Sequence, residues 1–210
     1  MLLRVLICLI IGYVCGTFES GYFLGKIFYG IDIRNYGSGN PGTSNTVRTL
    51  GKAPGYLVFA GDVIKVVFAV HLVRFVLFAG LPVTNILGMI TGFGAVLGHS
   101  YPPYLHFKGG KGMAVTGGVM LAFDWRMAAI ATAVFFVIFF ITRYMSVVSL
   151  TLTLMFPFMM LFFYPGQWSM FALAWPYTIF VWIRHRENIK RLRNGTENNF
   201  VKTSKKKKNP

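Results

Sequence analysis

The stretch from Gly98 to Gly112 combines the residue types that bind phosphate. It holds two histidines, two adjacent prolines, two lysines and three closely spaced glycines between long apolar runs. Because proline lacks an amide donor and clashes with the preceding turn, Pro102–Pro103 predicts a break in helical structure. Bare glycine backbone lets several amide N–H groups face one anion, and Lys108 and Lys111 add positive charge. The composition predicts a phosphate-binding loop. A cationic loop lying on anionic lipid is the alternative, although it would not require the glycines.

Another polar stretch, Gly37–Arg48, lies earlier in the chain and is rich in hydroxyl and amide side chains. In chain order it is the first motif, and Gly98–Gly112 is the second. Its glycine spacing formally matches the dinucleotide-binding fingerprint. No strand precedes it and no βαβ unit follows, so we reject that interpretation. What remains is a small-residue loop in which Arg48 can hold a phosphate through two parallel hydrogen bonds. An ordinary turn-rich connection is the alternative.

A third polar stretch, Arg184–Glu197, has the pattern of a helix that leaves the membrane and ends at a glycine C-cap. His185 and Asn188 are three residues apart, so one helical face can present both to a single ligand. Glu187 is expected to pair with Arg191 at the i,i+4 spacing. A basic stop-transfer helix would explain the charges alone, but it gives no reason for the histidine and the asparagine.

The chain that carries these motifs has the composition of a membrane protein. Hydrophobic residues make up 55% of its 210 residues, aromatic residues 17% and charged residues only 13%, and the mean hydropathy is +0.57. Apolar runs recur along the whole chain, which predicts one all-α polytopic membrane domain. The first run has no small-residue cleavage site before a soluble body, so we expect a retained span and not a signal peptide.

Several of the apolar runs are shorter than the ~17–25 residues of an ordinary span. The number of spans is therefore open among five, six and seven, and we expect about seven transmembrane helices with short re-entrant or loop segments on the cytoplasmic face. The candidate spans are Val5–Phe23, Tyr56–Ala79, Val83–Leu97, Met113–Phe123, Met127–Ile141, Val147–Phe163 and Trp168–Ile183.

Some polar side chains lie within these runs. Glu19 interrupts the first run, and a carboxylate at that depth should face protein or water. Asp62 and Lys65 lie three residues apart in the second run and are expected to pair. Cys8 and Cys15 share one face of the first run, which predicts helix packing and neither a disulfide nor a metal site.

Positive charge is concentrated on one side of the expected topology. The formal net charge is +15, and ten of the 21 basic residues follow Ile183. With seven spans, the side that carries all three motifs and the C-terminus receives 17 basic residues in its loops, and the other side receives two. The positive-inside rule then predicts a cytoplasmic C-terminus, an external N-terminus and three motifs on one cytoplasmic face. This distribution favours membrane lipids as partners and argues against nucleic acid.

Common kinds of catalytic machinery are missing from the sequence. No serine has the nucleophile-elbow spacing, and no histidine is followed five residues later by an aspartate, as in acyl-CoA-dependent glycerolipid acyltransferases. Six scattered acidic residues cannot supply the aspartate cluster that a Mg²⁺-dependent phosphotransferase needs. We therefore expect sites built for anions, with no metal and no cofactor.

Taken together, the motifs resemble those of the acyl-phosphate:glycerol-3-phosphate acyltransferase family (PlsY type), a bacterial membrane family. The resemblance covers most of the chain in the same order. Three motifs match: Ser38–Asn40 with Asn45 and Arg48; Gly98–His99 with 107–112; and His185–Ile189 with Gly195 and Glu197. The segments Arg143–Ser146 and Asp62–Lys65 also fit.

This resemblance implies transfer of an acyl group from acyl-phosphate to the 1-hydroxyl of glycerol 3-phosphate, which gives lysophosphatidic acid and inorganic phosphate. Because a mixed anhydride is already activated, positioning and charge stabilisation can carry much of the barrier. It also implies a multi-pass protein of the bacterial plasma (inner) membrane that is a monomer or weak oligomer. We expect an integral membrane acyltransferase domain over residues 1–197 and a basic, disordered cytoplasmic tail over 198–210.

The resemblance also implies site residues. Those implied as catalytic, which resemble the glycerol 3-phosphate site, are Ser38, Arg48, Lys108, His185 and Asn188. Those implied in substrate binding are Asn40, Ser44, Asn45, His99, Gly109, Gly110, Lys111, Gly112, Ser146 and Glu187. Of the second set, the residues that resemble the acyl-phosphate site are Ser44, Gly109, Gly110, Lys111 and Ser146.

The sequence departs from the family pattern at four positions. Thr43 and Ser44 stand where alanine and threonine are usual, and Ser44 keeps a hydroxyl. Met113 replaces a smaller aliphatic residue. Glu19 stands near the end of the first span where a proline is expected, which leaves the packing of that segment open.

Two other classes of function remain to be weighed. An anion or phosphate transporter could use the same cytoplasmic loops, but it predicts paired broken helices at the membrane midplane, and the chain has no internal repeat. A non-enzymatic membrane scaffold with a polybasic tail would leave His99, His185 and Asn188 without a use. We therefore favour the enzyme.

Overall fold

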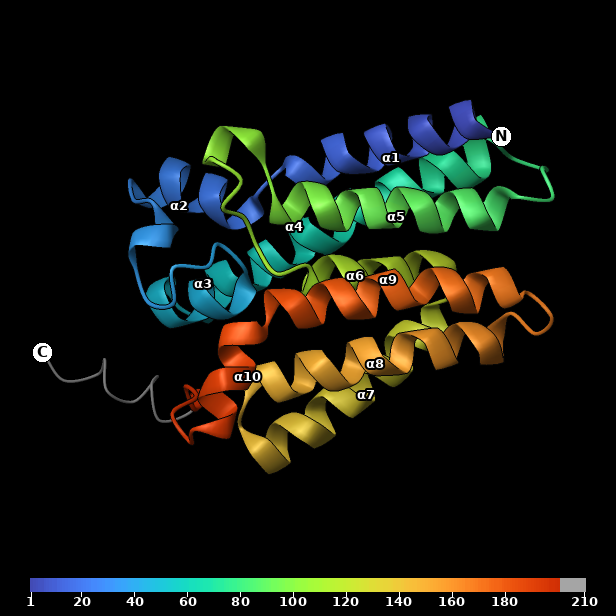
Figure 1. Cartoon of the computed structure of the whole chain (residues 1–210). Coiled ribbons are helices and arrows are strands. Elements are labelled where there is room, and N and C mark those ends of the chain that lie inside the picture. The colour runs from blue at the N-terminus through green and yellow to red at the C-terminus, as the bar shows by residue number, and fades with distance from the viewer. Residues whose placement is uncertain (201–210) are drawn as a thin grey trace, which may run out of the picture.

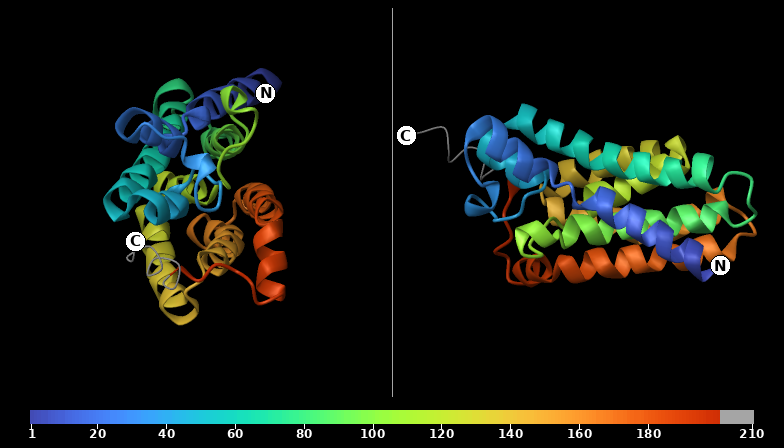
Figure 2. Two further views of the ribbon diagram at one scale, coloured as in Figure 1. Left: turned by 90° about the vertical axis from the view of Figure 1, so that its left-hand side faces the viewer. Right: turned by 90° about the horizontal axis from the view of Figure 1, so that it is seen from above.

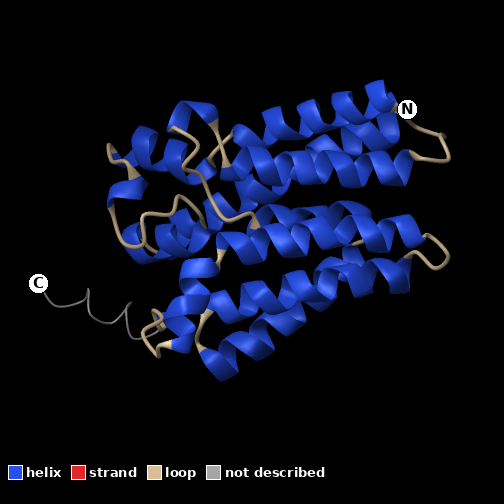
Figure 3. Cartoon of the chain, in the orientation of Figure 1, coloured by secondary structure: helices blue, strands red, loops and turns tan. Residues whose placement is uncertain are grey.

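The computed structural model describes residues 1–200 of the chain. Over this range the chain forms helices and no strand (Figure 3), which confirms the expected all-α fold. The elements in chain order are α1 (Leu2–Thr17), α2 (Ser20–Tyr29), η1 (Ile33–Asn35), α3 (Thr43–Leu50), α4 (Lys52–His71), η2 (Leu72–Leu77), α5 (Thr84–Ser100), η3 (Pro103–Leu105), α6 (Met113–Phe123), α7 (Trp125–Thr142), α8 (Met145–Phe163), α9 (Trp168–Arg184) and α10 (Arg186–Arg193).

The long helices run side by side, and the short helices α2, α3 and α10 gather at one end of the bundle (Figure 1). The N-terminus and the turns before α5 and α9 lie at the opposite end, as the right-hand view of Figure 2 also shows. The polar stretches 37–48, 98–112 and 184–197 all lie at the end with α2, α3 and α10, which is called the motif end below. The expected co-location of the three stretches is thus present in the fold.

Four segments are long and apolar enough to cross a membrane: Leu2–Tyr29, Lys52–Leu77, Trp125–Thr142 and Met145–Phe163. Helices α5 and α9 have 17 residues each and run beside them, and α6 has only 11. These lengths agree with a polytopic membrane protein. That the chain crosses the membrane seven times remains a prediction.

The first apolar run is not a single helix. Helix α1 ends at Thr17, and the backbone at Phe18 and Glu19 is extended before α2 begins at Ser20. The Glu19 side chain is fully buried in protein, as the cost of a carboxylate in lipid predicts. The break turns the chain toward the motif end.

The loop of the second motif begins later than expected. Helix α5 continues to Ser100, so Gly98 and His99 belong to its last turn. The helix stops there because the following Pro102 disfavours helical backbone in the residue before it. The loop proper therefore covers residues 101–112, with η3 as its only helical turn.

Glycines bring α1 and α5 into close contact. A Cβ atom at Gly12 would lie 1.9 Å from the carbonyl oxygen of Thr91, and one at Gly16 would lie 2.2 Å from that of Ala95. Gly98 of α5 approaches α1 in the same way. Small residues allow such approach between helices in lipid, where apolar contact alone gives little driving force. The close packing fixes the end of α5 that carries His99.

The largest apolar core surrounds α6, whose buried residues include Val115 and Val119. Tyr177 of α9 is fully buried there and donates a hydrogen bond of 2.5 Å to the carbonyl of Met89. Helix α7 lies at the edge, and few of its side chains are buried. Because the core encloses α6, the first turn of this short helix has a fixed position.

Other expectations about buried residues are confirmed. Lys65 Nζ lies 2.9 Å from Asp62 Oδ1, so the two residues pair as the spacing predicted. Cys8 is buried, Cys15 is half-buried, and both are free. Neither cysteine takes part in a disulfide.

Most of the predicted basic tail, 198–210, lies outside the described residues. Within the described part, Phe200 donates its N–H to the carbonyl of Arg143 at 3.0 Å. Its ring packs against Phe139, with the ring centroids 5.6 Å apart. The chain thus stays in contact with the helical body as far as residue 200.

Candidate active site

The second and third motifs contact each other directly at the motif end. The ammonium of Lys111 donates a hydrogen bond to Oδ1 of Asn188. The guanidinium of Arg184 donates to the carbonyls of Gly109 and Gly110, at 3.3 and 3.0 Å. These contacts place the glycine loop against the junction of α9 and α10.

The amides of the glycine loop are partly used inside the fold. Gly109 N–H donates to the carbonyl of Ser100 at 3.2 Å, and Gly110 N–H donates to that of His99 at 2.9 Å. These two amides are therefore not the free donors that the glycine composition predicted. The amides in the first turn of α6, which begins at Met113, have no acceptor in their own helix and remain for an anion.

Lys111 of the glycine loop contacts Asn188 of the third motif through its ammonium. Burial, together with the nearby charges of Arg191, Arg184 and Arg48, lowers its pKa to about 8, against the opposing charge of Glu197. An anion bound beside the ammonium would favour its charged form. The cationic surroundings of Lys111 therefore suit a phosphate group.

A carboxylate orients Asn188. Its Nδ2 donates to Oε1 of Glu197 at 2.7 Å, which leaves Oδ1 to accept from Lys111. Glu197 Oε2 accepts from Nε of Arg191, also at 2.7 Å. Together these bonds hold Lys111, Asn188 and Arg191 in one network.

The prediction that Glu187 pairs with Arg191 is wrong. Arg191 pairs with Glu197, whereas Glu187 is exposed and its Oε1 lies 3.7 Å from Nε of Arg186. Glu197 reaches the helix because Gly195 adopts a left-handed conformation that folds the chain back over α10. The partner therefore comes from beyond the helix.

His185 lies between α9 and α10 and is only 5% exposed. Its Nδ1 is 2.8 Å from the carbonyl of Val181, and since a carbonyl can only accept, Nδ1 carries the proton. Burial and, to a smaller extent, the charge of Lys111 lower the His185 pKa to about 4. The imidazole is thus neutral at pH 7, with Nε2 available as an acceptor.

Two asparagines of the first motif hold their own loop together. Asn45 is buried and accepts the N–H of Ser38 at 2.7 Å, while its Nδ2 donates to the carbonyls of Ile33 and Tyr36. Asn40 accepts the N–H of Gly42 at 2.9 Å. Both side chains shape the loop that precedes α3.

Arg48 projects from α3 and is about half buried. Burial is the main cause that lowers its pKa. The charge of Glu197 opposes this shift, and the charge of Arg191 adds to it. Its guanidinium lies over the ring of Phe200, 5.8 Å from the centroid. The first motif thus reaches the network of the other two through Arg48.

Buried polar atoms without a hydrogen-bond partner in residues 1–200 are concentrated at the motif end. Such atoms are rare in folded proteins, and bound ligands or water commonly satisfy them. Those at the motif end are Glu19 Oε1 and Oε2, Thr43 Oγ1, Arg48 Nε, Thr49 Oγ1, Ser100 Oγ, Ser146 Oγ and Arg184 Nε. We interpret those other than the two Glu19 atoms as part of the surface that receives the substrates.

The remaining predicted residues differ in exposure. Ser38, Lys108 and Glu187 are exposed and make no side-chain hydrogen bond to the network of Lys111 within residues 1–200. Ser44 is half-buried. His99 is 2% exposed and lies beneath the glycine loop, which Gly112 ends with a φ of 84° where α6 begins. The sequence did not single out Arg184 or Glu197 for these contacts.

Comparison with known proteins places this arrangement in a family. A family model described as glycerol-3-phosphate acyltransferase matches residues 6–195. The glycerol-3-phosphate acyltransferase of Bacillus subtilis is 40% identical over 197 residues, which cover 94% of this chain and 97% of that protein. That of Lactiplantibacillus plantarum is 39% identical over 197 residues, which cover 93% and 91%. The chain belongs to the glycerol-3-phosphate acyltransferase family.

Solved structures of this family share the fold. The crystal structure of PlsY (YgiH), an integral membrane glycerol 3-phosphate acyltransferase, in its glycerol 3-phosphate form has a TM-score of 0.81 and 34% identity to this chain. The match covers 93% of this chain and 94% of that one. The lysophosphatidic acid form gives a TM-score of 0.79 at 33% identity.

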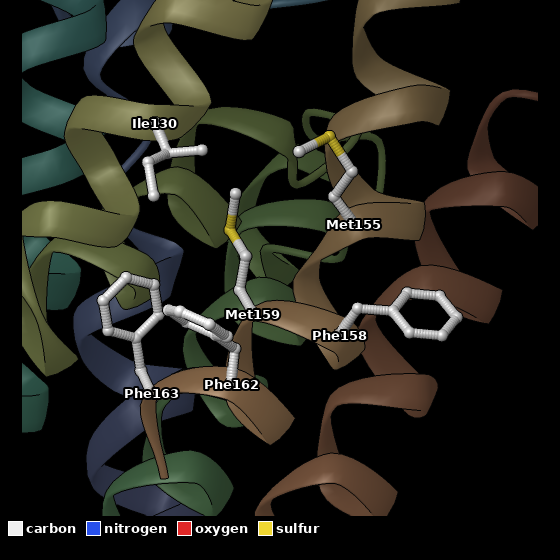
Figure 4. Close-up of a pocket in the computed structure, with 6 residues that line it drawn as sticks. All are labelled: Ile130, Met155, Phe158, Met159, Phe162 and Phe163. Atoms are coloured by element: carbon white, nitrogen blue, oxygen red, sulfur yellow. The ribbon is translucent and has the colours of Figure 1, made fainter. Parts of the chain in front are cut away.

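These matches confirm the family resemblance, the integral membrane fold and the acyltransferase class. The transporter alternative finds no support, because the matching proteins are named as acyltransferases. Within this glycerol-3-phosphate acyltransferase fold, two surface hollows are apolar, and no residue that lines them belongs to the network of Lys111. One, of about 260 Å³, lies between α7 and α8 and is lined by Ile130, Met155, Phe158, Met159, Phe162 and Phe163 (Figure 4).

Proposed function

We propose that this protein transfers an acyl group from acyl-phosphate to the 1-hydroxyl of glycerol 3-phosphate. The hydroxyl oxygen attacks the acyl carbon, the bond from that carbon to the phosphate oxygen breaks, and the hydroxyl proton leaves with the phosphate. The products are lysophosphatidic acid and inorganic phosphate. Both substrates are anions, and the reaction needs no covalent enzyme intermediate.

The observation that carries this proposal is the hydrogen bond from Lys111 to Asn188. It joins the glycine loop to α10 inside a cationic cluster that also contains Arg48, Arg184 and Arg191. Two phosphates held close together repel each other, so a site for both needs several positive charges. Charge-assisted hydrogen bonds from such groups also fix the orientation of each phosphate.

The arrangement favours the donor phosphate at the glycine loop. Gly112, between Lys111 and the first turn of α6, lies beside Ser100, whose Oγ has no partner within the described chain. Ser146 lies in the first turn of α8 and is also buried without a partner for its hydroxyl. In this assignment Ser44, Gly109 and Gly110 complete the acyl-phosphate site, while Gly112 is the N-cap of α6.

The acceptor phosphate is assigned to the first and third motifs. Arg48 supplies a planar guanidinium that binds phosphate through two parallel hydrogen bonds. Ser38 and Lys108 are exposed at the motif end and complete the assignment with His185 and Asn188. Asn40 and Asn45 act in this scheme by holding the loop that carries Ser38.

His185 is suited to orient the acceptor hydroxyl. Its protonated Nδ1 is engaged with Val181, so Nε2 can accept a hydrogen bond from the 1-hydroxyl. A group whose pKa is about 4 is a weak base, and it would not remove the proton before the acyl carbon is attacked. We therefore assign the proton to the leaving phosphate.

The acyl chain fits a lipid-facing groove between α8 and α9. This groove has a volume of about 290 Å³ and is lined by Leu154, Trp175, Thr178, Ile179, Trp182 and Ile183. Its end at Ile183 is two residues from His185, so a chain lying in it would have its polar end beside the site. The groove of Figure 4 contains Phe162 and Phe163, at the other end of α8, and is not part of this proposal.

We also propose that the motif end faces the cytoplasm of a bacterial inner membrane. The loop charges of the sequence support this orientation through the positive-inside rule. The proposed acyltransferase domain covers residues 1–197, and the protein acts as a monomer or weak oligomer. Surrounding lipids would supply the acyl chain's apolar environment.

The proposed reaction is tested with purified protein in liposomes, supplied separately with acyl-phosphate, acyl-CoA and acyl-carrier protein. We expect lysophosphatidic acid to form from acyl-phosphate and glycerol 3-phosphate without thioester or added metal. Equal activity with acyl-CoA, or loss of activity in EDTA, would contradict the proposal. Asn188→Ala, which removes the partner of Lys111, is the matched inactive control.

A further inference from the structure

Four ionisable side chains lie together beneath the glycine loop. Glu19, Asp62, Lys65 and His99 are 0%, 1%, 8% and 2% exposed. Nδ1 of His99 is 2.9 Å from Oε1 of Glu19 and 3.0 Å from Nζ of Lys65, and Nζ is 2.9 Å from Oδ1 of Asp62. Ionisable groups buried this deeply in a membrane protein are costly and usually serve a function.

The cluster does not have the features of a ligand site. The Lys65 ammonium is already taken up by Asp62, by Nδ1 of His99 and by the carbonyl of Phe18, to which it donates at 2.6 Å. Within residues 1–200, no group of three histidine, cysteine, aspartate or glutamate side chains could hold a metal ion. The cluster must therefore act through the parts of the chain that it contacts.

One such part is the glycine loop itself. The carbonyl of His99 accepts the N–H of Gly110 at 2.9 Å, and the loop lies directly on the imidazole, since a Cβ at Gly110 would be 2.0 Å from Nε2. A Cβ at Gly109 would be 3.1 Å from Oε1 of Glu19. His99 and Glu19 together form the floor on which the loop rests.

Glu19 also holds the beginning of the loop. Its backbone N–H donates to the hydroxyl of Tyr104 at 3.2 Å, and that hydroxyl donates to the carbonyl of Thr17 at 2.6 Å. Tyr104 belongs to η3, in the first half of the loop. The break between α1 and α2 is thus tied to the loop at two points, through the main chain and through the carboxylate.

We propose that Glu19 is a positioning residue for the phosphate-binding loop. Its carboxylate holds the imidazole of His99 under Gly110, and this sets the position of Lys111 and of the first turn of α6 relative to a substrate phosphate. The inference rests on the proposed function and deepens it, because it names what supports that site. Glu19 itself does not touch the substrate.

Glu19→Gln tests this role because it keeps the size of the side chain and removes its charge. We expect a KM for acyl-phosphate raised roughly tenfold, because the 2.9 Å contact between Glu19 Oε1 and His99 Nδ1 loses its charge, with the KM for glycerol 3-phosphate within about twofold of wild type. Asp62→Asn is the matched control, since it removes a carboxylate of the same cluster that pairs with Lys65 at 2.9 Å, lies 3.8 Å from Nδ1 of His99 and, unlike that of Glu19, has no contact with Gly109.

Hydrogen–deuterium exchange gives a readout that does not depend on activity. In Glu19→Gln we expect exchange of the loop peptide 106–112 to be about tenfold faster, while peptides from α1 and α5 keep the wild-type rate. In Asp62→Asn the loop peptide should keep its wild-type rate. Glu19→Asp, which retains the charge on a shorter side chain, should give an intermediate rate.

Gly110→Ala separates failure of this inference from failure of the proposed function, because it disturbs the loop directly. If Gly110→Ala and Glu19→Gln both raise the KM for glycerol 3-phosphate, the substrate assignment is wrong and the positioning role stands. If Glu19→Gln lowers the melting temperature while loop exchange and both KM values stay at wild-type levels, Glu19 only stabilises the fold and the inference is overturned.

Discussion

Lys111 and Asn188 are 77 residues apart in the chain, and a hydrogen bond from the lysine ammonium to the asparagine Oδ1 joins them. Glu197 orients the asparagine from its other side. In the proposed function, this contact makes the loop before α6 and the helix after α9 one anion-binding surface. The proposal therefore makes the chemistry depend on the charge of Lys111.

Activity should fall as the pH rises through about 8. Burial lowers the Lys111 pKa to about 8, so the ammonium is charged below this pH and neutral above it. The charged form binds phosphate, so kcat/KM for acyl-phosphate should decline on the alkaline side. Arginine stays charged in this range, and Lys111→Arg should therefore move the decline upward by at least one pH unit. A pH profile with the same alkaline limb in both proteins would contradict the assignment.

Arg48 should bind the phosphate of glycerol 3-phosphate. It lies on α3 in the motif that we assign to the acceptor, and its Nε has no hydrogen-bond partner in the described chain. Lysine cannot reproduce two parallel hydrogen bonds, each worth roughly 1.5–3 kcal/mol, so Arg48→Lys should raise the acceptor KM by ~10–150-fold.

Arg48→Ala should have the same effect more severely, and it should lower kcat if the hydroxyl is misplaced. The KM for acyl-phosphate should stay nearly unchanged in both variants. Steady-state kinetics with each substrate varied in turn distinguish the two sites. A rise in the donor KM alone would mean that the two phosphate sites are reversed.

Much of this arrangement could be predicted from the sequence because its signals are local or statistical. Apolar runs and loop charges predicted the membrane fold and the shared end of the motifs. The spacing of Asp62 and Lys65 predicted their pair, since both lie on one helix. Residue types in the glycine loop predicted an anion site.

What the sequence did not predict depends on contacts between distant segments. The i,i+4 rule favoured Glu187 as partner of Arg191, but the turn at Gly195 brings Glu197 there instead. Likewise, composition could not show that the amides of Gly109 and Gly110 would be used by the end of α5. Both outcomes follow from tertiary folding and not from local pattern.

The motif end should be accessible from the cytoplasm only. This prediction rests on the loop charges and on the position of the N-terminus at the opposite end of the bundle (Figure 1). Single cysteines at Gly37, Gly109 and Thr196, introduced one at a time after Cys8 and Cys15 are replaced, would be labelled in intact cells with a membrane-impermeant reagent. Labelling should require disruption of the membrane. Labelling of any one position from outside would break the common-face account.

The lysine-rich end should be dispensable for the chemistry. Lys205–Lys208 have the composition of a solvated segment attracted to anionic lipid. Truncation after Phe200 should leave turnover in detergent within about twofold of the full chain, because the charges of 201–210 act mainly on lipid. Truncation after Glu197 also removes the contacts of Phe200 and should lower thermal stability. A hundredfold loss of turnover on truncation after Phe200 would mean that residues 201–210 contribute to the site.

The central claim, direct transfer between two anions held in one site, is tested by phosphate release in a single turnover. The purified protein is mixed in excess with acyl-phosphate, with or without glycerol 3-phosphate, and inorganic phosphate and the acylation of the protein are measured together. We predict that phosphate appears only when glycerol 3-phosphate is present, one per molecule of lysophosphatidic acid, and that the protein carries no acyl group. A burst of phosphate without glycerol 3-phosphate, accompanied by an acylated protein, would contradict the account.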